Sequence, residues 1–199
     1  MNYTITDLID FIGKLPSVGP RSAKKIAISM IKDKKNMMNG FANILTNLSA
    51  SIKQCSKCRN FDTLEVCSIC VSRKNSNQLC IVSDVDDLWN IEKSEAYGGL
   101  YYILGGYLSA STSTLPEDLG IFQLCQIIKE SQISEVIFAL GSTISAQTTY
   151  YYVLDELEKF VKSENLAIKF TSLAFGIPMG SEIDYLDEGT IAQSFRSRG

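Results

Sequence analysis

Histidine is absent from this chain of 199 residues. Histidine is the base of serine and cysteine hydrolase triads, and it is the side chain that moves protons near neutral pH. The composition therefore excludes Ser-His-Asp and Cys-His catalysis, and it excludes hydrolysis at a histidine-bound zinc ion. Any chemistry would have to come from carboxylates, hydroxyls, lysine or a metal ion that they bind.

Long apolar runs are also missing, since no stretch of about eighteen apolar residues is present to cross a bilayer. The N-terminal segment has an acidic residue, Asp7, where an export signal has basic ones. We therefore expect a soluble, cytoplasmic protein without a membrane partner. The apolar fraction of 45% is enough for a hydrophobic core.

Charge is distributed unevenly along the chain. Residues 1–74 contain 12 Lys and Arg against 5 Asp and Glu, a net charge of +7, and residues 75–199 contain 7 against 17, a net charge of −10. These two values add to the total of −3. An anionic partner such as a nucleic acid is therefore expected to meet the first third of the chain.

The first 54 residues show three helical repeats of apolar side chains. Thr6 is the expected N-cap of a helix from Asp7 to Leu15, and Pro20 is expected in the first turn of a second helix. The apolar positions of the second and third helices are Ala23, Ile26, Ala27 and Met30, then Met38, Phe41, Leu45, Leu48 and Ile52. This spacing predicts a helical module over residues 1–54.

Strand and helix patterns alternate after residue 78, which is typical of an α/β fold with a mostly parallel sheet. The predicted strands are Leu79–Val82, Leu100–Leu104, Val136–Leu140 and Ile168–Ala174. The predicted helices are Asp87–Tyr97, Leu119–Ser131 and Gln147–Val161. The segment Gly105–Glu117, rich in Gly, Ser and Thr, is expected to be a long loop.

Four of the six cysteines form two closely spaced pairs, Cys55 with Cys58 and Cys67 with Cys70. Two residues between paired thiolates let both reach one ion, and two such pairs complete a tetrahedron. The pattern predicts one structural zinc ion without an open position for water, with an iron centre or unligated thiols as the alternatives. The remaining two are expected to be small buried hydrophobic residues: Cys80 and Cys125.

A basic turn precedes the second helix. Gly19 is followed by Arg21, Lys24 and Lys25 at the predicted helix start. A glycine lets backbone approach a phosphate closely, and a helix start presents free N–H groups to it. This favours contact with a sugar-phosphate backbone without reading of bases. The alternative is an ordinary connection between helices with a solvated basic face.

The same residues resemble a helix-hairpin-helix motif, which binds DNA without sequence specificity through a turn of the Leu-Pro-Gly-Val-Gly-Pro type. Here the turn is Leu-Pro-Ser-Val-Gly-Pro from Leu15 to Pro20. Ser17 stands where the motif has its first glycine. If that position requires a positive φ, serine costs about 1 kcal/mol of strain.

The whole chain resembles the RecR family of bacterial recombination mediators, in which a helical hairpin, a four-cysteine zinc finger and a Toprim α/β domain follow one another. Further similar segments are 79–92, 99–109 and a C-terminal signature over 173–190 that is followed by Arg196 and Arg198. The resemblance divides the chain into a hairpin module over 1–54, a zinc finger over 55–72, a Toprim-like domain over 78–172 and a strand-helix tail over 173–199.

The resemblance implies a function in DNA repair without enzymatic activity. Members form a ring-shaped homo-oligomer, expected to be a tetramer, and act with RecO and RecF to load the RecA recombinase onto gapped single-stranded DNA. The expected partners are therefore single- and double-stranded DNA, proteins of the RecO and RecF type, and further copies of this chain.

Catalytic Toprim enzymes hold Mg²⁺ with a glutamate after the first strand and a pair of acids after a later one. Here Ser83 occupies the first position, and Ser145 and Gln147 stand where the family has two carboxylates. Metal-dependent phosphoryl chemistry is therefore not expected. The two alternatives are a Mg²⁺-dependent Toprim nuclease or primase-like enzyme, and a module that binds only protein.

Other acids follow the first strand, namely Asp84, Asp86, Asp87 and Glu92. We expect them to contribute weakly to a protein-partner surface, in place of the missing Toprim carboxylates. The simpler interpretation is a solvated helix start, because acids near helix N-termini are stabilising without any function.

Overall fold

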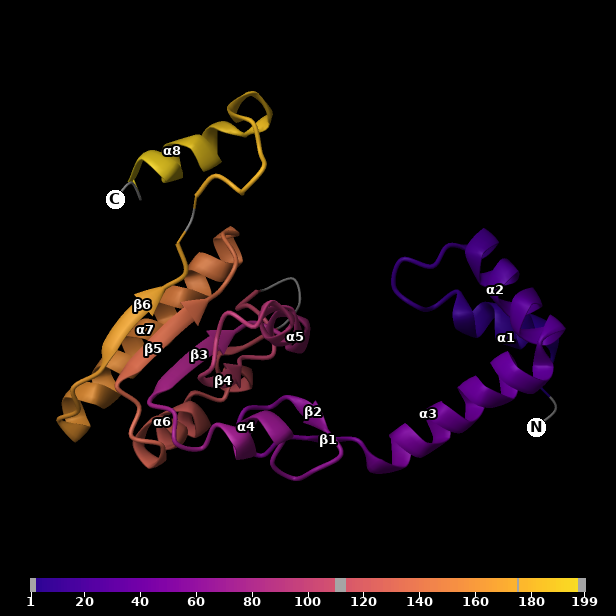
Figure 1. Ribbon diagram of the computed structural model, residues 1–199, viewed down its shortest axis with the longest axis horizontal. Coiled ribbons are helices and arrows are strands. Elements are labelled where there is room, and N and C mark those ends of the chain that lie inside the picture. The colour runs from indigo at the N-terminus through magenta and orange to yellow at the C-terminus, as the bar shows by residue number, and fades with distance from the viewer. Residues whose placement is uncertain (1–2, 110–113, 175, 197–199) are drawn as a thin grey trace. The chain divides into compact units, whose positions relative to one another are not determined.

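The structure is a computed structural model that describes residues 3–109, 114–174 and 176–196. The chain divides into two compact units, Met1–Ile52 and Lys53–Gly199 (Figure 1). Each unit has a hydrophobic core of its own.

The N-terminal unit is helical, as predicted. Its elements are α1 (Ile5–Ile12), α2 (Pro20–Lys32), a π-helical turn η1 (Lys34–Met38) and α3 (Asn39–Ser51). Ile12 of α1 and Ala23, Ala27 and Met30 of α2 form its small core. Helices α1 and α2 pack against each other because these side chains recur on one side of each helix.

The first helix starts earlier than predicted, because Thr4 and not Thr6 is its N-cap. The Thr4 hydroxyl accepts the Asp7 N–H at 3.2 Å, and the Asp7 carboxylate accepts the Thr4 N–H at 2.7 Å. This reciprocal pair is a capping box, in which an acid three residues after the cap completes the motif. The helix also ends at Ile12 rather than at Leu15.

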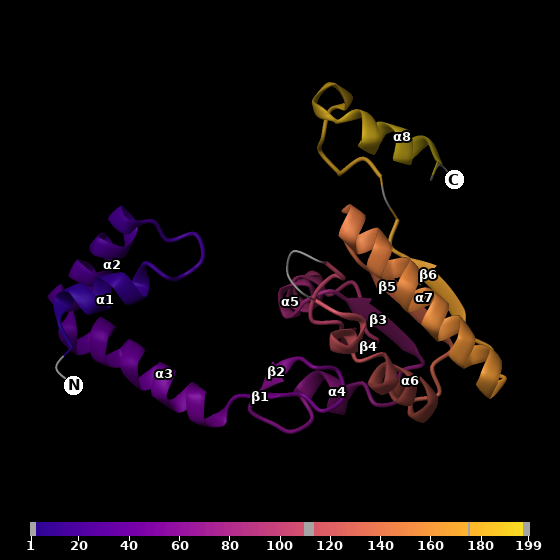
Figure 2. The same ribbon diagram turned by 180° about the vertical axis from the view of Figure 1, so that it is seen from behind.

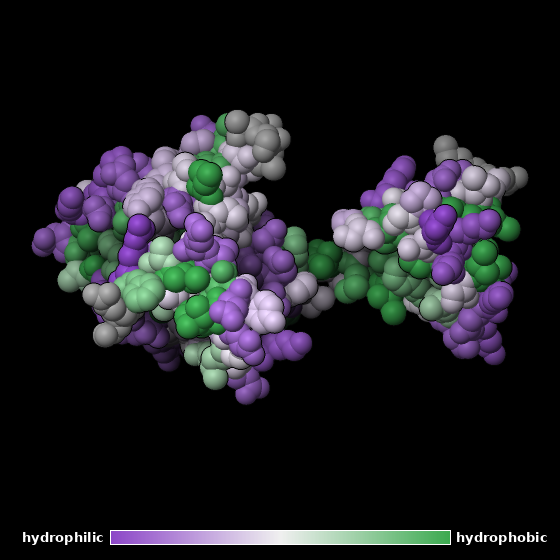
Figure 3. Space-filling view, turned by 90° about the horizontal axis from the view of Figure 1, so that it is seen from above, coloured by the Kyte–Doolittle hydropathy of each residue, from purple (hydrophilic) through white to green (hydrophobic). Residues whose placement is uncertain are grey.

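Helix α3 leaves its apolar side open. None of its side chains is buried, and the large apolar ones remain about half exposed. They are Phe41, Ile44, Leu45 and Leu48. Hydrophobic residues reach the surface of this unit next to hydrophilic ones in the space-filling view (Figure 3). Among its described residues, the N-terminal unit therefore does not cover the apolar side of α3.

The second unit is built on a four-stranded parallel sheet. Its strands are β3 (Gln78–Val82), β4 (Leu100–Ile103), β5 (Glu135–Ala139) and β6 (Lys169–Ser172), in the order β4-β3-β5-β6. All four predicted strands are confirmed, although the last ends at Ser172 rather than Ala174. After their first residues, Gln78 and Glu135, the central strands β3 and β5 are apolar, because both faces of the sheet are covered.

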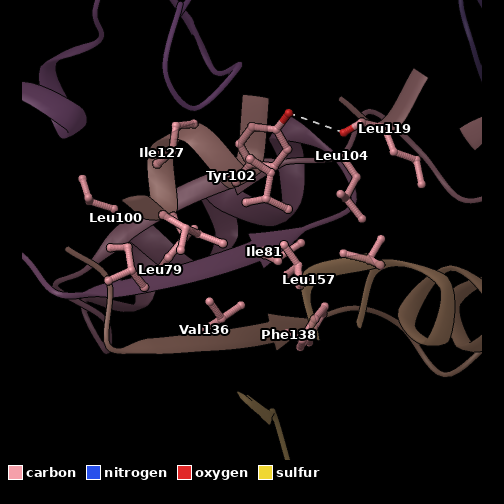
Figure 4. Close-up of a cluster of buried hydrophobic side chains, with 14 residues drawn as sticks. Leu79, Ile81, Leu100, Tyr102, Leu104, Leu119, Ile127, Val136, Phe138 and Leu157 are labelled. Carbon is pink, nitrogen blue, oxygen red and sulfur yellow. Dashed lines mark hydrogen bonds between the residues drawn. The ribbon is translucent and has the colours of Figure 1, made fainter. Parts of the chain in front are cut away.

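Alternate side chains of the sheet enter two different layers. Leu79 and Ile81 of β3 face α6 (Ile121–Glu130) and α7 (Ile144–Glu164), where the larger core lies (Figure 4). Cys80 and Val82 face α5 (Val85–Ser94) and the four-cysteine region. Helix α7 runs along β5 and β6 in both ribbon views (Figures 1 and 2). Cys80 is buried as predicted, and Cys125 on α6 is half-buried.

Several short elements had no prediction. They are β1 (Lys53–Gln54), β2 (Phe61–Asp62), α4 (Ser68–Ser72), η2 (Pro116–Leu119) and η3 (Ile183–Tyr185). Helix α8 (Glu188–Arg196) is the helix expected in the tail. The predicted loop includes residues 110–113, which lie outside the described residues, as does Arg198. No helix of the described chain is long and apolar enough to cross a membrane.

Candidate zinc centre and nucleic-acid interface

The four paired cysteines converge on one point. All four are buried, and their sulfur atoms lie within 4.8 Å of one another, with 3.4 Å between the sulfurs of Cys58 and Cys67. A tetrahedral zinc site with bonds of about 2.3 Å has sulfur-to-sulfur edges of about 3.8 Å, so the cluster has the size that zinc requires. The predicted zinc ligands Cys55, Cys58, Cys67 and Cys70 are therefore brought together as expected.

Local hydrogen bonds shape both cysteine pairs. In the first pair, the Cys55 N–H donates to the Asn60 carbonyl at 2.7 Å and the Arg59 N–H donates to the Cys55 carbonyl at 3.1 Å. In the second pair, Cys67 is the N-cap of α4, and its N–H donates to the Cys55 sulfur at 3.2 Å. Because turns preset the thiols, less entropy is lost when the ion binds.

Hydrogen bonds among the four cysteine side chains shift the pKa values of Cys58 and Cys67 in opposite directions. Hydrogen bonds from the Cys58 and Cys70 thiols lower the pKa of Cys67 to about 2, and the same bond raises the pKa of Cys58 far above its ordinary value. A zinc ion stabilises all four as thiolates, so its binding releases protons and contributes to folding. Four protein ligands leave no position for an activated water.

Arg59 joins the zinc finger to the α/β domain. Its guanidinium donates to the carbonyl oxygens of Leu104 at 2.8 Å, Asp118 at 3.1 Å and Leu119 at 3.2 Å. It also lies over the ring of Tyr102, with 5.9 Å from Cζ to the ring centroid. A single side chain next to the second cysteine therefore holds the end of β4 and the start of α6.

Further contacts extend this junction. The Gln123 amide donates to the Ser56 carbonyl at 2.6 Å, and the Ile103 N–H donates to the Cys58 carbonyl at 3.0 Å. At Gly120, where φ is +64°, an added Cβ would lie 2.5 Å from the Tyr102 hydroxyl oxygen, so only glycine fits. Sequence reasoning missed this junction because most of its acceptors are backbone carbonyls, which leave no residue-type signal.

The basic turn has the backbone of a helix-hairpin-helix motif. Ser17 adopts φ +63°, so the position where the motif has a glycine does require the left-handed conformation. Gly19 instead has φ −77° and is the N-cap of α2. A Cβ at Gly19 would meet no atom within 4 Å, so neither packing nor φ demands a glycine there. The bare backbone at Gly19 faces outward.

The start of α2 offers donors and charge together. Arg21, Lys24 and Lys25 are exposed, and their spacing places them on one side of the helix. None of the ion pairs formed by the described residues involves these three cations. The first-turn N–H groups of Arg21 and Ser22 have no intrahelical acceptor. The arrangement suits an anion such as a backbone phosphate.

The residues at the former Toprim metal position form a helix cap. Asp84 is the N-cap of α5, and the Asp87 carboxylate accepts the Asp84 N–H at 3.2 Å and the Ser83 hydroxyl. Asp86 is exposed. Among the described residues, only the four cysteines gather closely enough to hold a metal ion. Asp84, Asp86 and Asp87 therefore do not converge as Mg²⁺ ligands would.

Glu92 faces the interior of the unit rather than solvent. Its two carboxylate oxygens accept from the Arg73 guanidinium at 2.8 and 2.9 Å, and one of them also accepts the Tyr101 hydroxyl at 2.7 Å. Glu92, Arg73 and Tyr101 thus tie α5 to the sheet and to the segment after α4. A partner that used Glu92 would have to compete with this ion pair.

Together, the hairpin, the four-cysteine centre and the parallel α/β domain define a zinc-containing helix-hairpin-helix protein. Family models match in the same order: the RecR helix-hairpin-helix over residues 5–48, the RecR zinc finger domain with four cysteines over 52–72, the Toprim domain over 77–170, and the RecR C-terminal segment over 176–198. The chain belongs to the RecR family of recombination proteins.

Its relatives match over almost their whole length. The chain is 41% identical over 192 residues to the recombination protein RecR of Hyphomonas neptunium, covering 96% of this chain and 92% of that protein. It is 40% identical to that of Cereibacter sphaeroides, covering 98% and 95%, and 38% identical to that of Maricaulis maris, covering 98% and 94%. Membership implies a role in recombinational DNA repair.

Proposed function

We propose that this protein is a non-enzymatic DNA-binding mediator of recombination, which helps to load a recombinase onto gapped single-stranded DNA. The observation that carries the proposal is the hairpin between α1 and α2, where Gly19, Arg21, Lys24 and Lys25 present bare backbone and unpaired cations. These contacts suit the phosphates of single- and double-stranded DNA and read no base, so binding is expected to be independent of sequence.

Three positions of the Toprim-like domain are the reason that we propose no enzymatic activity. Ser83, Ser145 and Gln147 provide no carboxylate at the three positions where catalytic Toprim enzymes hold Mg²⁺. The acids that remain nearby cap a helix. The competing proposal is a Mg²⁺-dependent nuclease, and Mg²⁺-dependent cleavage of DNA that is lost on replacing Asp84, Asp86 and Asp87 would favour it.

We also propose a homo-oligomer, a tetrameric ring that acts with partners of the RecO and RecF type. The open apolar side of α3 supports self-association, because an apolar stripe of this kind gains free energy by burial. We propose the same division of the chain as the resemblance implies: a hairpin module over 1–54, a zinc finger over 55–72, a Toprim-like domain over 78–172 and a tail over 173–199. Light scattering of the protein, with and without DNA, should give a discrete multiple of 22.0 kDa.

The hairpin is tested by replacing Arg21, Lys24 and Lys25 together with alanine and measuring DNA affinity at several salt concentrations. Loss of three phosphate contacts should reduce the slope of log affinity against log salt by about 2 for single strands and by nearly 3 for duplex. The matched control replaces Lys32, Lys34 and Lys35, which removes the same charge from the same unit.

The two triple variants separate specific contact from overall charge. If the hairpin binds phosphates, only the first variant should lose most of its affinity at low salt. Equal losses in both variants would mean that net charge alone attracts DNA. Unchanged affinity in the hairpin variant would refute the assignment of this turn as the DNA-binding site.

A further inference from the structure

Trp89 on α5 is the only tryptophan of the chain, and 54% of it is exposed. Its ring is nevertheless fixed, because the indole N–H donates to the Asn60 side-chain oxygen at 3.2 Å. Asn60 is 5% exposed, and its carbonyl accepts the Cys55 N–H inside the zinc finger. The large aromatic surface is thus held in one orientation by a buried group and remains open to solvent.

The exposed neighbours of Trp89 on the helix surface are polar. Val85 and Leu88 are the buried positions of α5, whereas Asp86, Trp89 and Lys93 lie together on its exposed surface at spacings of three and four residues. Trp89 is therefore a single apolar group within a charged stripe. A rigid aromatic ring surrounded by polar groups is the arrangement found at the energetic centre of protein interfaces.

The charge around Trp89 selects the kind of partner. The acids on and next to α5, other than Glu92, are Asp84, Asp86, Asp87 and Glu95, and Lys93 is the one cation on the helix. Glu92 is neutralised by Arg73. The local net charge of α5 is therefore negative. Nucleic acid would be repelled from this surface, whereas a cationic protein segment would be attracted.

We propose that Trp89 is the centre of a docking surface for a protein partner that presents an arginine-rich segment. A guanidinium stacks on the indole ring, and the carboxylate of Asp86 meets a neighbouring cation of the same segment. Because Asn60 already fixes the ring, little side-chain entropy is lost on binding. The proposal rests on the mediator function, since it gives the chemistry of the partner contact.

The test uses the full-length, zinc-loaded protein and nona-arginine as the probe. Affinity is measured by calorimetry for wild type, Trp89→Ala, Asp86→Asn and Tyr151→Ala. Tyr151 on α7 is 67% exposed and is the matched control for loss of a surface aromatic ring. Trp89→Ala should weaken binding by about fivefold to thirtyfold, the range of a desolvated cation–π contact, whereas Tyr151→Ala should change it less than about twofold.

Wild-type protein provides a second measurement that does not depend on a variant folding. Because Trp89 is the sole tryptophan, acrylamide quenching of protein fluorescence reports the access to this ring alone. Saturating peptide should lower the quenching slope. An unchanged slope, or equal losses in Trp89→Ala and Tyr151→Ala, would overturn the proposal.

The same measurements with single-stranded DNA test whether the Trp89 surface binds nucleic acid instead of protein. If oligo(dT) protects Trp89 from acrylamide and the Trp89→Ala variant loses DNA affinity, the surface binds nucleic acid and the proposal is wrong. The variant without Arg21, Lys24 and Lys25 should bind nona-arginine as wild type does. Failure of the DNA-binding hairpin would therefore be seen separately from failure of the Trp89 surface.

Discussion

Replacing Arg59 with alanine should destabilise the second unit more than any other single change to an arginine or lysine of the zinc finger. The guanidinium has three carbonyl acceptors, of which those of Leu104 and Leu119 are partly buried and that of Asp118 is exposed. Truncation removes the charge-assisted hydrogen bonds to all three acceptors at once. It also removes the packing of the side chain against Tyr102.

The expected magnitude follows from these contacts. Each of the two partly buried charge-assisted bonds contributes about 1 to 1.5 kcal/mol after competition with water, below the range for buried ones. The cation–π contact adds about 0.5 kcal/mol, which gives a total loss of about 3 kcal/mol. Arg59 has φ +68°, so Arg59→Gly should be about 1 kcal/mol more stable than Arg59→Ala because glycine relieves the left-handed strain.

Urea unfolding of zinc-loaded protein checks this prediction. Trp89 fluorescence reports on the unit concerned, because its indole is bonded to Asn60 in the zinc finger. With a slope of about 2 kcal/mol per molar urea, the midpoint should fall by about 1.5 M for Arg59→Ala. Lys57→Ala is the control, because Lys57 is exposed in the same turn.

A loss below about 1 kcal/mol in Arg59→Ala would refute the reasoning, because it would equal that of a single exposed contact. The order of the two variants is a second criterion. If Arg59→Gly were less stable than Arg59→Ala, the left-handed backbone at this position would not be the source of strain.

Three further changes have defined outcomes. Ser17→Gly should stabilise the N-terminal unit by about 1 kcal/mol in thermal unfolding, since φ is +63° there, and no gain would contradict the strain. Cys67→Ser should abolish stoichiometric zinc in metal analysis and expose Trp89 to quencher, whereas retained zinc would exclude Cys67 as a ligand. Hydrogen bonds from Thr4 lower the pKa of Asp7 below its ordinary 3.8. A lowered folded pKa means that Asp7→Asn should reduce amide-exchange protection of α1 above about pH 4, and that the difference should vanish as the pH falls through the folded pKa.

The elements with a strong periodic signal were predictable from sequence. The apolar repeat of α2 and the continuous apolar runs of β3 and β5 follow from burial, so their spacing indicated both the type of these elements and their place in the fold. The cysteine pairs were predictable for a similar reason, because four ligands at fixed spacing have one common geometric solution. The positive φ of Ser17 could be anticipated from the glycine that the motif has there.

Other features of the structure depend on contacts between particular residues, and the residue types alone do not show which residues make these contacts. The capping box has a sequence signal in Thr4 and Asp7, but Thr6 lies nearer to the helical repeat, so the repeat alone predicts the wrong N-cap. The π-helical turn at Lys34–Met38 has no periodicity to read. Glu92 was expected at a partner surface, yet it pairs with Arg73, because its position on α5 turns it toward the sheet.

The hydrogen bonds of Arg59 also have a consequence for how the sequence of this protein can change during evolution. Leu104 and Leu119 bound the segment between β4 and α6, and the same guanidinium binds both. Arg59 thus holds the two ends of this segment together, and the entropy of closing such a segment grows only with the logarithm of its length. Insertions and deletions should therefore accumulate in this segment before they are tolerated elsewhere in the α/β domain, so new contacts can evolve there at small cost to stability.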